Sequence, residues 1–267
     1  MRHWLAAFWL ISIVPPGISQ TTEVHSFANL NRVLPDGNAA GLSEVRSINS
    51  TVAAISAVKL KLRIDGEFNG DLYGYLRHIR SGETNYCVLL NRPGRSAAKT
   101  VGYADAGLNV TFQQTAADVH LYRSFTNLPP AMPLNGVWQP DGRAVDPGVV
   151  LETSPRTGSL DSFNSIGASG EWTLFLADME SGGTNMLVSW ELEITGPTVP
   201  SITWPIPADI VYGTPLGPTQ LNASSPASGT FVYNPPTGTM LNAGNGRTLS
   251  VTFFPPISTR TPLAPPM

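Results

Sequence analysis

The stretch SGEWTLFLADMESGGTNMLVSWELEITG, residues 169–196, decides the fold. Large apolar side chains take alternate positions from Trp172 to Leu176 and again from Val188 to Ile194, a period typical of strands with one face in a core. We interpret the two runs as a hairpin that buries both tryptophans. The loop 179–185 carries Glu180 as its only charge, which raises the question of a catalytic site, a calcium site or a plain turn.

The same alternation recurs along the chain, most clearly in VKLKLRI at 58–64. The chain holds 25 glycines and 24 prolines, and only 13% of its residues are charged, which is typical of many short strands joined by tight turns. No segment has convincing helical amphipathicity. The pattern therefore predicts an all-β fold. The predicted strands are a short one after the turn at 35–37, then 58–64, 72–76, 86–90, 108–113, 172–178 and 187–194.

Proline and glycine divide the second half of the chain. The segment 127–148 has five prolines, which remove backbone donors, so we predict a long surface connection and not a central strand. Gly196 and Pro197 mark a domain boundary. Short Thr, Val and aromatic runs between Pro and Gly turns at 202–256 predict a second, small sandwich, and residues 257–267 form a proline-rich tail.

The N-terminus, residues 1–19, is typical of a secretory signal, because Arg2 and His3 precede an apolar run that ends in two prolines and a small-x-small pattern. A buried strand or a short membrane anchor is the alternative, and no later segment is a transmembrane candidate. We therefore expect a secreted, extracellular or cell-surface protein without a membrane span in its mature chain. Cys87 is the only cysteine, so we expect a free thiol in the core.

The charge pattern argues against nucleic-acid binding, because the net charge is −3 and no basic run appears.

The histidines and the serine motifs of the sequence argue against catalysis. His25, His78 and His120 follow no metal-binding spacing, and no nucleophile loop of the Gly-Thr-Ser type is present. A Ser-His-Asp site assembled across strands is the remaining catalytic alternative, since such triads are defined by geometry and not by order.

Four motifs resemble a known family. They are GDLYGYL at 70–76, YADAG at 103–107, GEWTLFLAD at 170–178 and LVSWELEI at 187–194. In this order they resemble a P domain, also called a P/Homo B domain, over residues 24–196. The resemblance implies a jelly-roll-like β-sandwich that accompanies the catalytic domain of subtilisin-like proprotein convertases, which are serine-type endopeptidases. Residues 202–256 are similar to the immunoglobulin-like repeats of bacterial exported proteins, but the expected final strand is missing.

The resemblance implies a calcium site at the recurrent acidic positions of the family. Asp71, Asp105 and Asp178 stand at these positions, and oxygen ligands from separate loops are what a hard cation needs. The alternative is that each aspartate caps a turn beside a glycine. No other cofactor is expected.

These observations predict a non-catalytic β-sandwich module of a secreted bacterial protein that binds, attaches to or stabilises a partner. One alternative is a detached P domain that accompanies a secreted subtilisin-like protease. Another is binding to a cell-surface protein or polysaccharide, since such sandwiches often bind sugars through aromatics. Tyr73, Tyr75, Tyr103 and Trp138 are the candidate exposed aromatics, and Trp138 is the predicted contact residue because prolines surround it in an expected loop.

Overall fold

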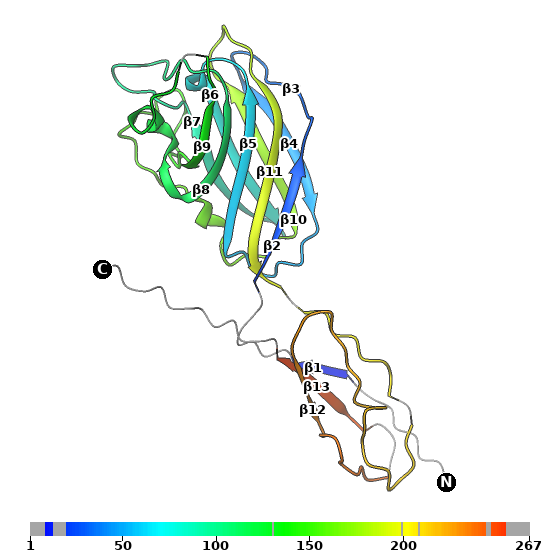
Figure 1. Cartoon of the computed structure of the whole chain (residues 1–267). Helices are drawn as coiled ribbons and strands as arrows, with labels where there is room; N and C mark the ends of the chain where they lie inside the picture. The colour runs from blue at the N-terminus through cyan, green and yellow to red at the C-terminus, as the bar shows by residue number, and fades with distance from the viewer. Residues whose placement is uncertain are drawn as a thin grey trace, which may run out of the picture. The chain divides into compact units, whose positions relative to one another are not determined.

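The chain forms two compact units. The computed structural model describes residues 9–12 (backbone only), 20–129, 131–198, 200–207, 209–243 and 247–254. The larger unit runs from Thr21 to Pro197, and the smaller unit combines the N-terminal residues through Gln20 with those from Thr198 onward (Figure 1). The division lies directly after the Gly196–Pro197 pair.

The larger unit is a sandwich of two sheets, which Figure 1 shows as two layers. This confirms the predicted all-β class. Most neighbouring strands are antiparallel, but β8 and β9 run parallel. The first sheet has the order β2(Gln20–Phe27), β11(Met186–Pro197), β5(Ala57–Asp65), β8(Leu108–Asp118), β9(Leu134–Gln139), with β3(Arg32–Val33) on β11. The second has the order β4(Asn38–Ile48), β10(Gly170–Asp178), β6(Leu72–Arg80), β7(Glu83–Asn91). The described residues of this unit also form the short 3-10 helices η1(Asn69–Asp71), η2(Val119–Ser124) and η3(Leu160–Phe163).

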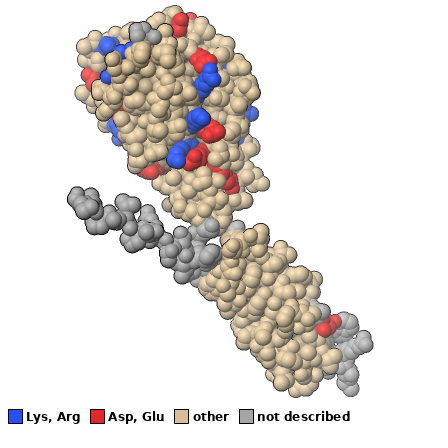
Figure 2. All heavy atoms as spheres, in the orientation of Figure 1, with Lys and Arg blue, Asp and Glu red and all other residues tan. Residues whose placement is uncertain are grey.

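Strand β5 shows how the sequence builds the sandwich. Its apolar residues from Val58 to Ile64 are all buried, whereas the basic residues between them lie on the outer face. There they face acids of β11: the Lys59 ammonium lies 2.7 Å from a carboxylate oxygen of Glu193, and Lys61 is paired in register with Glu191. Figure 2 shows such basic and acidic side chains in contact on this unit. Opposite charges on facing strands favour this register.

The opening stretch does not form the predicted hairpin. Strand β10 pairs with β4 and β6 in one sheet, whereas β11 pairs with β3 and β5 in the other, so the loop 179–185 carries the chain across the sandwich. The predicted burial is confirmed, because Trp172 is 0% and Trp190 is 2% exposed. Period-two alternation indicates which face of a strand is buried but not which strand lies beside it.

The predicted surface connection at 127–148 contains an ordered strand, which corrects that expectation. Strand β9 lies between Pro133 and Pro140 and pairs in parallel with β8 at the edge of its sheet. The prolines flank the strand, so none of them removes a donor from the ladder. Trp138 therefore sits in a strand and not in a loop.

The smaller unit has a three-stranded sheet of β1(Trp9–Ser12), β13(Leu249–Phe254) and β12(Thr230–Asn234). Trp204, Leu216 and Val251 are among its core residues. Strand β1 pairs in parallel with β13. It occupies the edge of β13 that would be unpaired if the immunoglobulin-like repeat lacked its final strand. The other residues of the predicted signal and the tail at 257–267 lie outside the described residues. Within the described part of the chain, no helix is long and apolar enough to cross a membrane.

Candidate functional site

Two of the three predicted aspartates meet at one end of the second sheet. Strand β10 ends at Asp178, which is paired in register with Leu72, the residue after Asp71. The backbone amide of Met179 donates to the Asp71 carbonyl at 2.8 Å. The start of β6 thus fixes the beginning of the loop 179–185, and the Asp71 and Asp178 carboxyl groups come to the same end of the second sheet.

At this end of the sheet the backbone around Gly70 packs closely against residues 101–103. The amide of Gly70 donates to the Tyr103 carbonyl at 2.8 Å, and a Cβ at Gly70 would lie 2.3 Å from the Val101 carbonyl oxygen. Only glycine fits such an approach. Phe68 has a left-handed backbone with φ of 52°, which is uncommon for a bulky residue and turns the chain into η1.

These segments line an open acidic hollow of about 310 Å³. One acid of its lining, Asp71, is 7% exposed, while the side chain of the other, Glu180, is 50% exposed. Phe68 and Tyr103 give it aromatic surface. We call this site the acidic hollow; its lining residues are Phe68, Asp71, Val101, Gly102, Tyr103, Ala104, Glu180, Ser181 and Gly182.

The charge of the acidic hollow is incompletely balanced. The pKa of Asp71 is raised to about 6, mainly by burial; Arg92 lowers it, and the nearby carboxylates of Asp178, Glu180 and Asp36 add to the rise. The Arg92 guanidinium lies 3.6 Å from Asp71 and 3.0 Å from Glu180. Burial also raises the pKa of Asp178. The single positive charge of Arg92 is therefore shared between the carboxylates of Asp71 and Glu180.

Asp105 does not share this site. Its carboxylate accepts hydrogen bonds from the Tyr122 hydroxyl at 2.6 Å and from Arg123 Nε at 2.7 Å. No three His, Cys, Asp or Glu side chains of the described residues are grouped so that they could hold a metal ion. The three predicted calcium ligands thus do not form a common cage, and only Asp71 and Asp178 lie where one cation could approach both.

Replacing Asp71 with asparagine is expected to stabilise the larger unit above pH 6. The raised pKa means that the folded state keeps a proton that the unfolded state releases from about 3.8, so this contribution is complete below 3.8 and lost as the pH rises through about 6. At pH 7.5 the asparagine removes the cost of the charge, about 1 to 2 kcal/mol after allowance for screening. Urea unfolding at several pH values measures it.

The exposed Asp65, which pairs with Arg63 at 3.0 Å, provides the matched control. Asp65→Asn is expected to change the free energy of unfolding by less than about 0.5 kcal/mol at every pH. An Asp71→Asn variant that is equally or less stable than the parent at pH 7.5, or stabilised equally at pH 3.5, would contradict the prediction.

A buried His–Asp pair lies elsewhere in the sandwich. His120 Nδ1 and an oxygen of Asp141 are 2.8 Å apart, and both side chains are 0% exposed. His120 Nε2 lies 3.0 Å from the Arg95 carbonyl oxygen. Because a carbonyl can only accept, Nε2 carries a hydrogen, and neither ring nitrogen is left to take a proton from a serine hydroxyl. The pair therefore ties loops together in the described structure.

The aromatic candidates are less exposed than expected. Trp138 is 6% exposed and donates its indole hydrogen to the Asn135 carbonyl, so the predicted contact residue is a core residue of β9. Tyr73 and Tyr75 are half-buried on the outer face of the second sheet, where Tyr75 stacks on Phe175 with 4.9 Å between centroids. Tyr103 alone of the four lines the acidic hollow.

Cys87 is a free, buried cysteine, as predicted. Burial raises the pKa of its thiol to about 12, which keeps it protonated and unreactive at neutral pH.

The sequence alone gives Arg92 no role and marks Glu180 only as the one charge of its loop. Arg92 is 2% exposed, and its Nε donates to the Gly70 carbonyl at 2.6 Å. An isolated arginine after a predicted strand carries no spacing signal, so only the fold shows that it lies between two acids.

Comparisons with known proteins give little beyond this geometry. No protein-family model and no curated protein matches the chain. Two solved structures are similar at 14% identity: the serine protease of Aeromonas sobria with its chaperone, which covers 70% of this chain at a TM-score of 0.37, and the protease of Aeromonas sobria, which covers 68% at 0.36. The chain spans 28% of the length of each protease chain. With scores this low, function has to be argued from the residues of this chain.

Proposed function

We propose that this chain is a non-catalytic module of a secreted bacterial protein, and that its acidic hollow binds a basic side chain of a partner protein. One observation carries the proposal: Asp71 is buried at the base of an open hollow, with a pKa raised to about 6 among neighbouring acids. A partner lysine or arginine would add the missing positive charge.

The aromatic residues that line the acidic hollow favour a basic side chain as its ligand over a bare metal ion. Phe68, which is 39% exposed, and Tyr103 both line the acidic hollow, so the aliphatic stem and the cation of a basic side chain would contact aromatic surface. The P-domain resemblance makes a subtilisin-like serine endopeptidase the first partner to test. Secretion rests on the signal predicted from the sequence of residues 1–19.

Two other ligands are weaker proposals. Calcium is supported by the raised pKa values of Asp71 and Asp178, which a divalent cation would lower, but only these two predicted ligands share the edge. A polysaccharide is supported by Tyr73, Tyr75 and Phe175 on one sheet face, although ring stacking covers part of the surface that a sugar would use.

The charge-reversing variant Glu180→Lys tests the proposal. Titration with N-acetylarginine amide, followed by amide chemical shifts, is expected to perturb residues 68–71, 101–104 and 178–182 of the parent and to leave the variant unperturbed, because the introduced ammonium competes for the site. A secreted protease that copurifies with the parent is expected to be lost from the variant. Glu83→Lys, an exposed acid at the start of β7, is the control with the same charge change.

The outcomes separate the candidates. Shifts elsewhere, or equal shifts in parent and Glu180→Lys, contradict binding at the acidic hollow. Calcium chloride that raises the melting temperature of the parent, but not of Asp71→Asn, would favour the metal. Retention on an insoluble polysaccharide that Tyr75→Ala abolishes would favour the sugar.

A further inference from the structure

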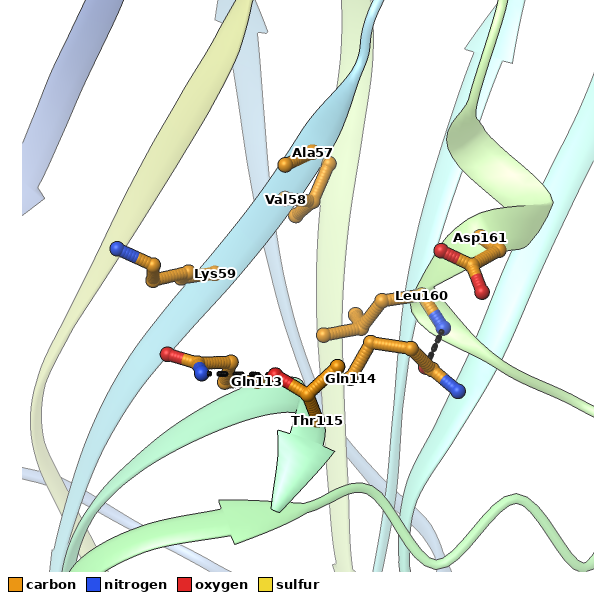
Figure 3. A pocket seen from close by; sticks show the side chains of 8 residues that line it. All are labelled: Ala57, Val58, Lys59, Gln113, Gln114, Thr115, Leu160 and Asp161. Carbon is orange, nitrogen blue, oxygen red and sulfur yellow. Dashed lines mark hydrogen bonds between the residues drawn. The ribbon is translucent and has the colours of Figure 1, made fainter. Parts of the chain in front are cut away.

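A second hollow opens inside the first sheet, where two paired strands separate. Strand β5 pairs with β8 in the register Leu60 to Phe112 through Ile64 to Leu108. Continued in the same register, Ala57–Lys59 would face Gln113–Thr115. The ladder stops at Leu60 instead, and a hollow of about 530 Å³ lies between these two triplets (Figure 3). We call it the strand gap; its lining residues are the two triplets with Leu160 and Asp161.

The strand gap exists because β8 bulges. On its other side β8 pairs with β9, and both Phe112 and Ala117 are opposite Trp138, so the intervening residues 113–116 leave the ladder. Their side chains are held by local bonds, drawn dashed in Figure 3. Gln113 Nε2 donates to the Thr115 hydroxyl at 3.1 Å, and the Gln114 side-chain oxygen accepts from the Leu160 amide at 3.0 Å.

The strand gap exposes a short length of backbone edge on β5. Residues 57–59 pair with β11 on one side only, at Thr195 through Glu193. Because successive residues of a strand point their backbone groups to opposite sides, one or two of the three direct N–H and C=O groups toward the strand gap. The edge is bounded at Ile55, which exchanges backbone bonds with Ile166 and Ser165 at 2.7 and 2.8 Å, and at Leu60, where β8 begins to pair.

Side chains give the strand gap a defined chemistry. Val58 and Leu160, 4% and 1% exposed, supply an apolar floor. The charge of Lys59 is balanced by Glu193 at 2.7 Å, whereas the exposed Asp161 forms no ion pair among the described residues and accepts one bond from Asn164 at 3.1 Å. The strand gap is therefore negative at its η3 end.

We propose that the strand gap binds an extended peptide of a partner protein, which adds backbone hydrogen bonds to β5 at residues 57–59. An apolar side chain of the peptide packs on Val58 and Leu160, and a neighbouring basic side chain pairs with Asp161. Addition of a strand to an unpaired edge is an established mode of peptide recognition, in which the backbone supplies affinity and alternate side chains supply specificity. This site shares no residue with the acidic hollow, so each can fail without the other.

A labelled, end-capped peptide Ser-Thr-Val-Lys-Val-Thr-Ser is the probe, and fluorescence anisotropy with the full chain is the measurement. Saturable binding is expected, with slower hydrogen exchange at the amides of residues 57–59. The same peptide with proline at both valine positions is expected not to bind, because it lacks the backbone donors. Asp161→Asn is expected to weaken the lysine peptide about three- to fivefold and to leave a peptide with glutamine in place of lysine unchanged.

Several results would overturn the proposal. Equal binding of the proline peptide would show that the backbone edge is not used, and protection mapped outside residues 55–60 and 113–116 would place the peptide elsewhere. Absence of saturable binding to a parent whose melting curve shows it folded would remove the site. A concentration-dependent dimer that protects residues 57–59 without peptide would assign the edge to a second copy instead.

Discussion

Replacing His120 with alanine is expected to lower the free energy of unfolding of the larger unit by about 3 to 5 kcal/mol. The change leaves the Asp141 carboxylate 0% exposed, with Arg143 at 3.2 Å as its remaining ionic partner. It also removes the bond to the Arg95 carbonyl. A buried charge that loses one of its two ionic partners keeps its full desolvation cost, so the loss is larger than that of a surface pair. Urea unfolding at pH 7 measures it.

A double-mutant cycle identifies the cause of this loss. If the cost comes from the loss of the His120 partner of Asp141, then His120→Ala with Asp141→Asn is less destabilised than the sum of the single variants by at least about 1 kcal/mol. His25→Ala is the control, because His25 is partly exposed and 3.4 Å from Glu23, and it is expected to cost less than about 0.5 kcal/mol. A cost for His120→Ala as small as that of the control would show that the pair contributes little.

The sequence predicted the strands better than their pairing. The alternation in β5 and β10 identifies buried residues correctly, because burial of a strand face depends mainly on its own pattern. The hairpin assigned to 169–196 is wrong, because the choice of sheet depends on partners up to about 150 residues away, such as β3 and β4. The sequence pattern does not indicate β9, because five prolines in 127–148 argue against a strand unless their positions outside its two ends are known.

The candidate sites likewise have some features that the sequence predicts and others that it does not. Asp71 and Asp178 could be selected from the sequence because the P-domain resemblance implies acidic ligands at their positions. The separation of Asp105, the position of Arg92 and the strand gap could not be predicted, since each depends on contacts between distant segments. Arg92 and Glu180 form a hydrogen bond although they are 88 residues apart in the sequence. The strand gap depends on a bulge in β8 that no local sequence pattern indicates.

Replacing Trp172 with alanine is expected to cost the larger unit about 3 to 5 kcal/mol, which is comparable to the whole stability of a marginal domain. Its ring is 0% exposed, lies 4.2 Å from the His78 ring and 5.2 Å from the Phe163 ring between centroids, and donates to the Ala168 carbonyl at 3.0 Å. The cavity left between two sheets cannot collapse without moving their strands. Trp172→Phe keeps most of this volume and is expected to cost about 1 to 2 kcal/mol.

The second unit supplies the matched comparison, and it makes the experiment a test of the domain division. Trp204 is 8% exposed and donates to the Gln220 carbonyl at 2.9 Å in the smaller unit. If the two units unfold independently, Trp172→Ala lowers only the transition of the sandwich and Trp204→Ala only that of the smaller unit, in a calorimetric scan of the full chain. If both variants shift one shared transition, the units unfold together, and the cost of Trp172→Ala would then belong to the whole chain.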